Sequence, residues 1–486
     1  MRSTAIFLTV VMLATLLMPG AWAASEQGPD GSAYEYEKHG SAHPDYYCEI
    51  TRADTVGDVV YIPAVLEGYD VAVISEGAFS GCRMTCAVVP QTVAVISEGA
   101  FGDCPYLRDV YFLGDRPRME GAFDGSARFH AMPGRLGWED VETIPTATLG
   151  GIVYAMMPDC AMAVGGEPTD GTVTIEPVVE GAAVRRIGPY AFAGAMQPDG
   201  EVERRSDIRE ARISEGVEIV GERAFYYSDI ESVGFADSVG AIHDEAFRGC
   251  VLLGSLALDS VRSIGFEAFR DCAAIRQLVV PGSVERCGAG AFYLCMGMEA
   301  AEVSASAIPE RMFGYCSGLE RVTLHGTEAI GSCAFYRCDS LRALELEDVR
   351  AIGSEAFRDC ASLEEAVLGR AETIGQAAFR GCVSLEAITM PDTVSYLGRY
   401  AFADCIGLKR IVSLGSAPAG DSTVFLNVEA TVGCRPEHAD SWISSDFGLD
   451  VACDGRSDRI AGWLLVISLL AVSAAAVMLI RKRSDE

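Results

Sequence analysis

The sequence predicts a solenoid, mainly β or α/β, in which each coil of about 22 residues adds one short strand to a parallel sheet. Three observations support this prediction. Phenylalanines recur at a nearly constant interval, an alternating apolar segment follows most of them at a fixed distance, and the residues around them repeat in the same order. The coils fall into two arrays, and an apolar run near the C-terminus adds one transmembrane helix to the fold.

Phenylalanine recurs every 21 to 23 residues along most of the chain. The members of this series are Phe79 and Phe101, and then Phe225, Phe247, Phe269, Phe292, Phe313, Phe335, Phe357, Phe379 and Phe402. Their surroundings repeat as well, because residues 264–272 read Ile-Gly-Phe-Glu-Ala-Phe-Arg-Asp-Cys and residues 352–360 read Ile-Gly-Ser-Glu-Ala-Phe-Arg-Asp-Cys. A fixed period of this length indicates a repeat architecture.

A short apolar segment after each phenylalanine predicts the strand of each coil. An aliphatic residue such as Leu319 stands six residues after most of the phenylalanines, and two apolar positions such as Val322 and Leu324 follow it. This alternation fits a strand with one buried face. One coil cannot bury both that face and its phenylalanine, whereas stacked coils can, with about 1.5–3 kcal/mol gained for each large side chain.

The repeated pattern Ile-Gly-x-x-Ala-Phe-x-x-Cys-x-x-Leu-x-x-Val-x-Leu resembles the BspA-like, treponemal type of leucine-rich repeat. The resemblance covers residues 46–442, where the motif recurs in register at least ten times. It implies a right-handed leucine-rich-repeat superhelix. Proteins that resemble this one are mostly surface proteins of bacteria and some protists, associated with adhesion to host matrix proteins or to other cells. The resemblance therefore implies a bacterial cell-surface protein that binds other proteins.

A second level of repetition divides the coils into two arrays. Val65-Leu66-Glu67-Gly68 returns as Val178-Val179-Glu180-Gly181, and both segments are expected to cover the open end of a solenoid. We therefore expect a first array with caps at residues 44–145 and a second array with caps at residues 150–445.

The ends of the arrays and one interruption also show in the sequence. Residues 112–117 lead to Trp138 and the similar residues 413–418 lead to Trp442, which predicts a C-terminal cap for each array. A polar excursion at residues 197–207 breaks the period, and insertions in repeat proteins form surface loops. A surface loop without a binding role is the simpler interpretation, and a loop that contacts a ligand is the alternative.

Both ends of the chain carry signals for export and membrane insertion. Residues 1–23 have the layout of a secretory signal peptide, and a flexible leader follows at residues 24–43. Residues 460–480 form an uncharged run that can cross a ~30 Å hydrocarbon core, with a buried core helix as the alternative. The basic residues of the tail at 481–486 place that tail in the cytoplasm, and residues 446–459 form a short stalk. We therefore expect a single-pass protein of the cell membrane with an extracellular N-terminal ectodomain.

The seventeen cysteines fall into two groups. Ten of them, the ladder cysteines, stand three residues after a repeat phenylalanine: Cys82, Cys104, Cys250, Cys272, Cys295, Cys316, Cys338, Cys360, Cys382 and Cys405. Their common position predicts buried thiols between coils, although disulfides are permitted outside the cell. The better disulfide candidates, with Cys434–Cys453 as the first pair expected, are Cys48, Cys86, Cys160, Cys287, Cys333, Cys434 and Cys453.

Charge and motifs restrict the chemistry. A formal net charge of −31 argues against nucleic acid or anionic lipid as a main partner, because either requires a basic face. The sequence contains no Gly-x-Ser-x-Gly elbow, no P-loop and no EF-hand calcium loop, and its closest histidine pair, His39 and His43, lies in the expected leader. We expect no catalytic residue, no cofactor and no metal site.

The outward-facing strand positions form the expected binding face, because the curvature of a solenoid turns them into a long concave surface. Their mixed charges suit protein contacts better than a glycan platform, and an ordinary solvated face is the alternative. The candidate residues are Arg108, Tyr111, Arg276, Gln277, Glu320, Arg321, Thr323, Arg342, Glu345, Glu364, Glu365, Glu386, Thr389, Lys409 and Arg410.

These observations favour a cell-surface leucine-rich-repeat protein that mediates protein–protein interaction, with adhesion to host matrix or to other cells as its role. A structural envelope protein that binds its own kind is the first alternative. A surface hydrolase is the second, and the absence of a catalytic motif opposes it. The partners expected are an extracellular protein, either host matrix or cell-surface, or a second copy of the chain, together with the membrane through the C-terminal helix.

Overall fold

The computed structural model describes residues 32–39, 47–124, 127–168, 170–197 and 202–452. The predicted signal peptide, transmembrane helix and cytoplasmic tail lie outside these residues, as does Cys453. Within the described part of the chain, no helix is long and apolar enough to cross a membrane. The chain forms two compact units, one ending at Ser317 and the other beginning at Gly318, so the first array and the beginning of the second belong to the same unit.

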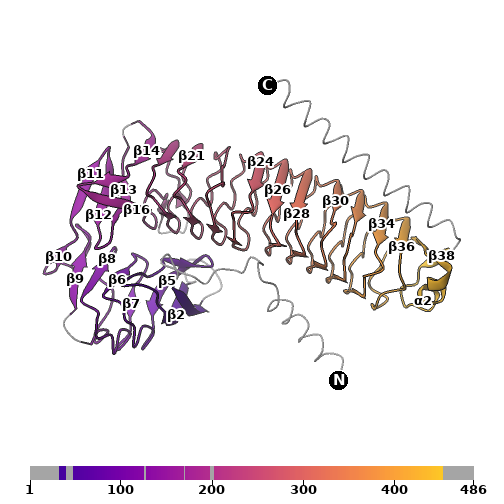
Figure 1. Ribbon diagram of the computed structural model, residues 1–486, viewed down its shortest axis with the longest axis horizontal. Coiled ribbons are helices and arrows are strands. Elements are labelled where there is room, and N and C mark those ends of the chain that lie inside the picture. Colours follow the sequence, from indigo (N-terminus) through magenta and orange to yellow (C-terminus); the bar gives the residue numbers. More distant parts are fainter. Residues whose placement is uncertain (1–31, 40–46, 125–126, 169, 198–201, 453–486) are drawn as a thin grey trace. The chain divides into compact units, whose positions relative to one another are not determined.

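Most coils contribute two strands, which differs from the single strand expected. A main strand lies where the sequence alternates, and a short strand of two residues forms at the segment before the repeat phenylalanine. In each unit both kinds of strand pair in parallel with their counterparts in the next coil, so parallel sheets run along the stacked coils (Figure 1). The fold is therefore a mainly β solenoid whose strands recur about every 22 residues.

The first array contains two sheets. Its main strands pair in parallel in the order β10-β9-β8-β6-β3. They are β3 (Val59–Tyr61), β6 (Cys86–Val89), β8 (Asp109–Phe112), β9 (Arg128–Ala131) and β10 (Glu142–Thr143). The second sheet consists of β1 (Ala33–His39), β2 (Tyr47–Asp54), β4 (Val65–Leu66), β5 (Tyr69–Ile74) and β7 (Val95–Ile96). Strand β1 lies in the segment expected to be a flexible leader, and it pairs antiparallel with β2 over its whole length.

The second array begins with antiparallel strands. Strand β11 (Thr146–Leu149) pairs with β12 (Ile152–Met156), and β12 pairs with β13 (Ala161–Gly166). We call β12 and β13 the cap hairpin. The short strands that continue this sheet are β15 (Val178–Val179), β16 (Ala182–Ile187), β20 (Ile219–Val220), β22 (Ala241–Ile242), β23 (Ser263–Ile264) and β25 (Arg286–Cys287).

The main strands of the second array in the first unit form two groups, β14-β19-β21 and β24-β26. Their bounds are Thr172–Ile175 for β14, Glu210–Ile213 for β19, Ser232–Phe235 for β21, Gln277–Val280 for β24 and Ala300–Ser304 for β26; β27 is Ala307–Ile308. The insertion expected to be a loop forms a small antiparallel hairpin instead, made of β17 (Ala195–Met196) and β18 (Val202–Glu203).

The second unit continues both kinds of strand. Its main strands are β28 (Arg321–His325), β30 (Ala343–Glu345), β32 (Glu365–Val367), β34 (Ala387–Met390), β36 (Arg410–Ser413), β37 (Thr431–Gly433) and β38 (Asp450–Ala452). Its short strands are β29 (Ala329–Ile330), β31 (Ala351–Ile352), β33 (Thr373–Ile374) and β35 (Tyr396–Leu397). A 3₁₀ turn, η1 (Pro436–His438), and helix α2 (Ala439–Ile443) precede β38, which lies in the segment expected to be a stalk.

A column of stacked phenylalanine rings fills the core of each unit, as the sequence predicts. In the second unit the rings of Phe357 and Phe379 lie 5.1 Å apart and those of Phe379 and Phe402 lie 5.2 Å apart, and both pairs are stacked. In the first unit Phe225 and Phe247 repeat this arrangement at 5.1 Å. Such contacts add about 0.5–1.5 kcal/mol to the burial of each ring. The constant interval in the sequence therefore corresponds to one ring per coil.

The turn before each phenylalanine requires a left-handed residue. Gly77, Glu245 and Glu355 each precede an Ala-Phe pair and have φ angles of 70°, 54° and 57°. Glycine adopts this conformation at no steric cost, whereas other residues do so only when the surrounding structure holds them. Here the next coil supplies that support, because the backbone N–H of Glu355 donates to the carbonyl of Gln376 at 2.8 Å.

The ladder cysteines are buried thiols that form no disulfide, as predicted. Most donate a hydrogen bond to the carbonyl of the phenylalanine in the preceding coil; the distance is 3.0 Å from the Cys250 sulfur to the Phe225 oxygen and 3.2 Å from Cys382 to Phe357. Burial raises the pKa of the Cys250 thiol to about 12, so it stays protonated at neutral pH. These thiols are therefore unreactive packing groups.

The disulfide prediction is wrong for five of the seven remaining cysteines, because Cys48, Cys86, Cys160, Cys287 and Cys333 are not disulfide-bonded. Apart from Cys333 they fill buried positions; Cys287, for example, pairs in register with Ile264 of the preceding coil and takes the place of an aliphatic residue. Cys434 is disulfide-bonded.

Alkylation should separate these thiols by their burial. With iodoacetamide at neutral pH we expect the ladder cysteines to stay unmodified in the folded protein, because they are buried and protonated, and to react after unfolding in guanidinium chloride. Among the cysteines of the described chain that form no disulfide, Cys333 is the one that is partly exposed, and it should react first. Peptide mass spectrometry measures each site. Rapid labelling of Cys250 or Cys382 in the folded state would contradict the described packing.

Candidate functional site

The outward side chains of the main strands line up in columns because the strands pair in register. In the second unit Glu345 pairs with Val367, and Val367 with Thr389. A neighbouring column contains Glu365, Ala387 and Arg410. Side chains of one column lie one strand spacing apart, about 4.8 Å. The fold therefore presents rows of side chains on one face of the sheet.

The candidate residues of the second array lie on this face or at the strand starts that border it. Arg342, Glu364, Glu386 and Lys409 each stand immediately before a main strand. Thr389 is half-buried, and the exposed ones are Arg276, Gln277, Glu320, Arg321, Thr323, Arg342, Glu345, Glu364, Glu365, Glu386, Lys409 and Arg410.

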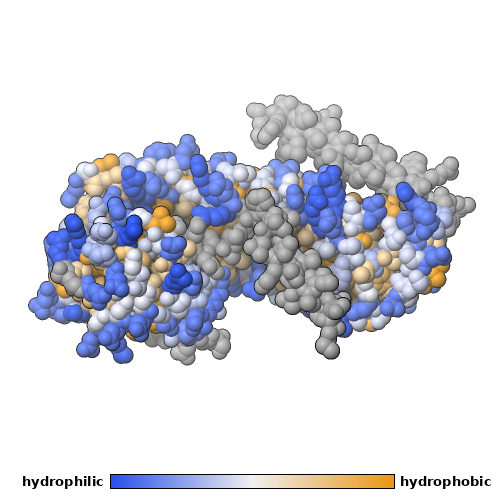
Figure 2. All heavy atoms as spheres, turned by 60° about the horizontal axis from the view of Figure 1, so that its bottom comes forward, coloured by the Kyte–Doolittle hydropathy of each residue, from blue (hydrophilic) through white to orange (hydrophobic). Residues whose placement is uncertain are grey.

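Electrostatics on this face follow from its mixed charges. Arg276 pairs with Glu299 at 3.2 Å, and Arg321 pairs with Glu320 at the same distance. Partial burial raises the pKa of Glu345, and the nearby carboxylates Glu347 and Glu365 add to the rise. In the view of Figure 2, hydrophilic residues dominate the described surface and hydrophobic residues lie scattered among them. The face therefore offers charged and hydrogen-bonding groups to a partner.

In the first array the outward strand face is largely covered, which differs from the expectation of a free face there. Tyr61, Cys86 and Val88 point outward from β3 and β6 and form an apolar cluster with Met157 and Met162, which belong to the cap hairpin and its turn. The candidate residue Tyr111 is half-buried beside this cluster, and Arg108 is exposed.

Tyr61 anchors the cap hairpin to the first array. Its hydroxyl donates to Asp159 at 2.6 Å, and the guanidinium of Arg186 lies 4.0 Å from the centre of its ring. Burial raises the pKa of the Tyr61 hydroxyl far above its usual value, so it remains a hydrogen-bond donor. These contacts join residues about 100 positions apart in the sequence, and the sequence analysis did not predict them.

A polar group next to this contact also escaped the sequence analysis. His130 stacks on Tyr111 with ring centres 4.5 Å apart, and its two ring nitrogens face Asp109 at 2.8 Å and Glu142 at 3.5 Å. Burial would raise the pKa of Asp109, but hydrogen bonds from His130 and Arg128 hold it below its usual value. No group of histidine, cysteine and acidic side chains in the described chain has the geometry of a metal site.

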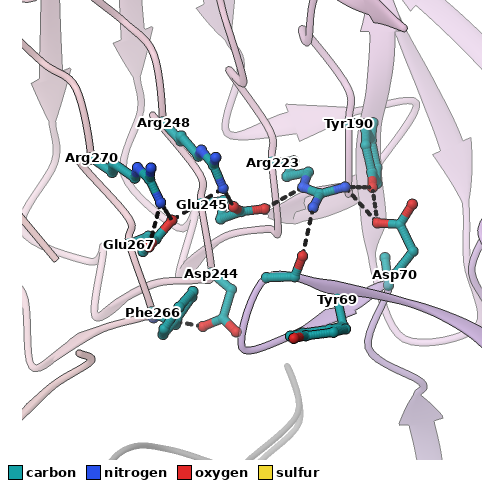
Figure 3. Close-up of polar contacts among 12 residues, drawn as sticks. Tyr69, Asp70, Tyr190, Arg223, Asp244, Glu245, Arg248, Phe266, Glu267 and Arg270 are labelled. Atoms are coloured by element: carbon teal, nitrogen blue, oxygen red, sulfur yellow. Dashed lines mark hydrogen bonds and ion pairs between the residues drawn. The ribbon is translucent and has the colours of Figure 1, made fainter. Parts of the chain in front are cut away.

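A buried ion network joins the turn between β4 and β5 of the first array to the second array (Figure 3). Arg223 of the second array donates to the carbonyl of Gly68 at 3.0 Å and pairs with the carboxylates of Asp70 and Glu245. The Asp244 carboxylate accepts the backbone N–H of Glu67 at 3.0 Å. We call these contacts the inter-array contact. They lie within the first compact unit.

The charges of the inter-array contact are balanced along a chain of ion pairs. Arg248 bridges Glu245 and Glu267, and Arg270 pairs with Glu267 at 2.7 Å. Burial would raise the pKa of Glu245, but Arg223 and Arg248 outweigh that effect and hold it below its usual value.

Asp244 differs from Glu245 because its partners are backbone N–H groups. Burial raises its pKa well above the usual value, and the nearby Glu222 adds to this. In the inter-array contact the carboxyl group of Glu245 is therefore stabilised in its charged form, and that of Asp244 in its neutral form.

A break in the repeat could have revealed this network. The 113-residue offset between the caps places Ala183 opposite Asp70, and Arg223 stands at the left-handed position that glycine or glutamate takes in several other coils. Charged residues such as Asp70 and Arg223, at positions where the other repeats have different residues, are the signal for this network. The sequence does not show that these residues contact each other.

A parallel β solenoid with an exposed, polar strand face belongs to the class of protein-binding repeat scaffolds. A model of the BspA type leucine-rich repeat region matches six copies at residues 68–120, 172–299 and 300–409, more than half of the chain. The chain therefore belongs to the BspA-type leucine-rich-repeat family, which supports protein–protein interaction in general. No curated protein matches the chain.

Solved structures with this fold are similar to the chain only at low identity. A leucine-rich repeat protein from Bacteroides ovatus is 23% identical, with a TM-score of 0.37, over 78% of this chain and 93% of the other. A leucine rich cell surface protein from Faecalibacterium prausnitzii is 20% identical, with a TM-score of 0.37, over 65% of this chain and 97% of the other. A leucine-rich repeat protein of T. pallidum is 21% identical, with a TM-score of 0.36, over 40% of this chain and 91% of the other.

Proposed function

We propose that the protein is exported, held in the cell membrane by residues 460–480, and binds an extracellular protein through the outward strand face of the second array. Its role is adhesion to host matrix proteins or to other cells. The apolar runs at both ends of the sequence support this location. Family membership supports binding as the general activity.

One observation carries the choice of surface. The main strands from β28 to β36 present exposed charged residues in rows, whereas the comparable face of the first array is covered by the cap hairpin. A surface covered within its own chain is not free for a partner. The second array therefore supplies the binding face.

Binding of the full chain, purified in detergent, to immobilised matrix proteins and to itself tests this proposal. Once a ligand is found, the variant Glu364→Lys/Glu386→Lys should bind it about tenfold more weakly or more, equivalent to about 1.4 kcal/mol, because two adjacent exposed charges are reversed. The matched control is Asp348→Lys/Asp392→Lys, which reverses two exposed charges in the turns after β30 and β34.

Loss of binding in the control with full binding in the strand-face variant would place the site elsewhere. Binding only to a second copy would favour a structural envelope protein over an adhesin. Binding to neither matrix protein nor a second copy would contradict the proposed function.

A further inference from the structure

A cleft of about 440 Å³ opens in the first unit, between the first array and the start of the second. Its volume falls in the range of about 300–1,000 Å³ that is usual for small-molecule sites, which often lie between domains. Leu113 and Met132 of the first array and Val164 and Pro189 of the second give it apolar walls. Gln91 joins the two sides, because its side-chain amide donates to the Pro189 carbonyl at 3.0 Å.

Asp70 lines this cleft with a carboxylate that is held in place and still has an open acceptor. Its Oδ1 receives the hydroxyl of Tyr190 at 2.8 Å and pairs with Arg223. Its Oδ2 points away from both groups in Figure 3 and accepts no hydrogen bond from the described residues. The side chain is 41% exposed, so an incoming donor can reach it.

Arg135 lines the same cleft and supplies the opposite charge. It is exposed, and its guanidinium makes no ion pair within the described chain. A free guanidinium offers two parallel N–H donors to a carboxylate. The cleft therefore combines one available anion, one available cation and an apolar wall.

We propose that the cleft binds a small zwitterion with an apolar side chain, either a free α-amino acid or a short peptide. Its ammonium group binds Asp70, its carboxylate binds Arg135, and its side chain packs on the apolar wall. A simple anion would meet Asp70 and a simple cation would meet Arg135. A neutral apolar ligand would take both charges out of water without a partner, which is costly. Only a ligand with both charges satisfies all three features.

The ligand would touch both arrays, because Asp70 and Arg135 belong to the first and Val164 and Pro189 to the second. Anything that binds the assembled state stabilises it by mass action. Binding should therefore slow hydrogen exchange in β5, next to Asp70.

Isothermal titration calorimetry of the full chain in detergent tests the proposal. The probes are leucine, the dipeptide Leu-Leu, its N-acetyl form and its C-terminal amide. We expect leucine or Leu-Leu to bind, and each capped form to bind at least about tenfold more weakly than Leu-Leu. The two uncapped probes decide between an amino acid and a peptide.

Arg135→Gln should weaken Leu-Leu about tenfold and leave the amide unaffected, because only the carboxylate contact is lost. The matched control is Arg83→Gln, another exposed arginine of the first array that makes no ion pair within the described chain; it should bind like the parent. No binding of leucine or Leu-Leu at millimolar concentration would overturn the proposal. So would equal binding of the capped forms, or an unchanged Arg135→Gln variant. The strand-face test uses different ligands and residues, so either proposal can fail without the other.

Discussion

Replacing Phe357 by alanine is expected to lower the free energy of unfolding of the second unit by about 3–5 kcal/mol. The ring is fully buried and stacks between Phe335 at 5.2 Å and Phe379 at 5.1 Å. Its loss leaves a cavity in a column where each coil depends on its two neighbours. Guanidinium chloride unfolding, followed by circular dichroism, measures the change in the full chain.

Phe357→Leu is the matched control. Leucine keeps most of the buried volume and loses the ring contacts, so the cost should be smaller, about 1–2 kcal/mol. If alanine were no more costly than leucine, the ring column would not be the main support of the coil.

Replacing Arg223 by methionine is also expected to have a large effect, on the stability of the inter-array contact. Removing one partner of a buried ion pair costs about 3–5 kcal/mol, because the other charge remains buried without its partner. Arg223 is 4% exposed, and its loss removes the hydrogen bond to Gly68 and the ion pair to Asp70 that join the first array to the second. We expect faster hydrogen exchange in β5 and at the turn before it, measured by mass spectrometry.

Arg270→Met is the control for this effect. Arg270 pairs with Glu267 in the same network and makes no hydrogen bond or ion pair with the first array within the described chain, so its loss should leave exchange in β5 unchanged. Equal exchange in both variants would show that Arg223 does not hold the arrays together.

The stability of the inter-array contact should shift toward lower pH in Arg223→Met. The pKa of Glu245 is lowered in the folded protein, so its contribution is present above the pKa of a free glutamate, about 4.3, and is lost as pH falls. The pKa of Asp244 is raised, so its contribution is present at low pH and is lost as pH rises. Without Arg223 the contribution of Glu245 becomes smaller, whereas that of Asp244 remains. Lowering the pH should therefore stabilise the inter-array contact more in the variant than in the parent protein.

The repeat features could be predicted because period and position translate directly into stacked coils. The interval between phenylalanines predicted one ring per coil, and the common position of the ladder cysteines predicted that they are buried. The short strands were missed because two residues are too few to show alternation. Strand β1 did carry a signal, since Tyr34 and Tyr36 alternate with glutamates, but the polar residues around it suggested a leader.

The contacts between the arrays could not be predicted, because they depend on how separate coils meet in space. Asp70 and Arg223 are 153 positions apart, and Tyr61 and Asp159 are 98 apart. The outward positions within the main strands, by contrast, follow from alternation, and the structure places twelve of the candidates on exposed positions of the second array.

The stacking of the coils also determines how the molecule responds to force. The hydrogen bonds between neighbouring main strands, such as β34 and β36, run from coil to coil along the direction of stacking. A pull on the two ends of the second unit along that direction would load these bonds end to end, and would open coils one at a time from a free end. Each opened coil would release about 22 residues, so the chain would lengthen in steps of that size.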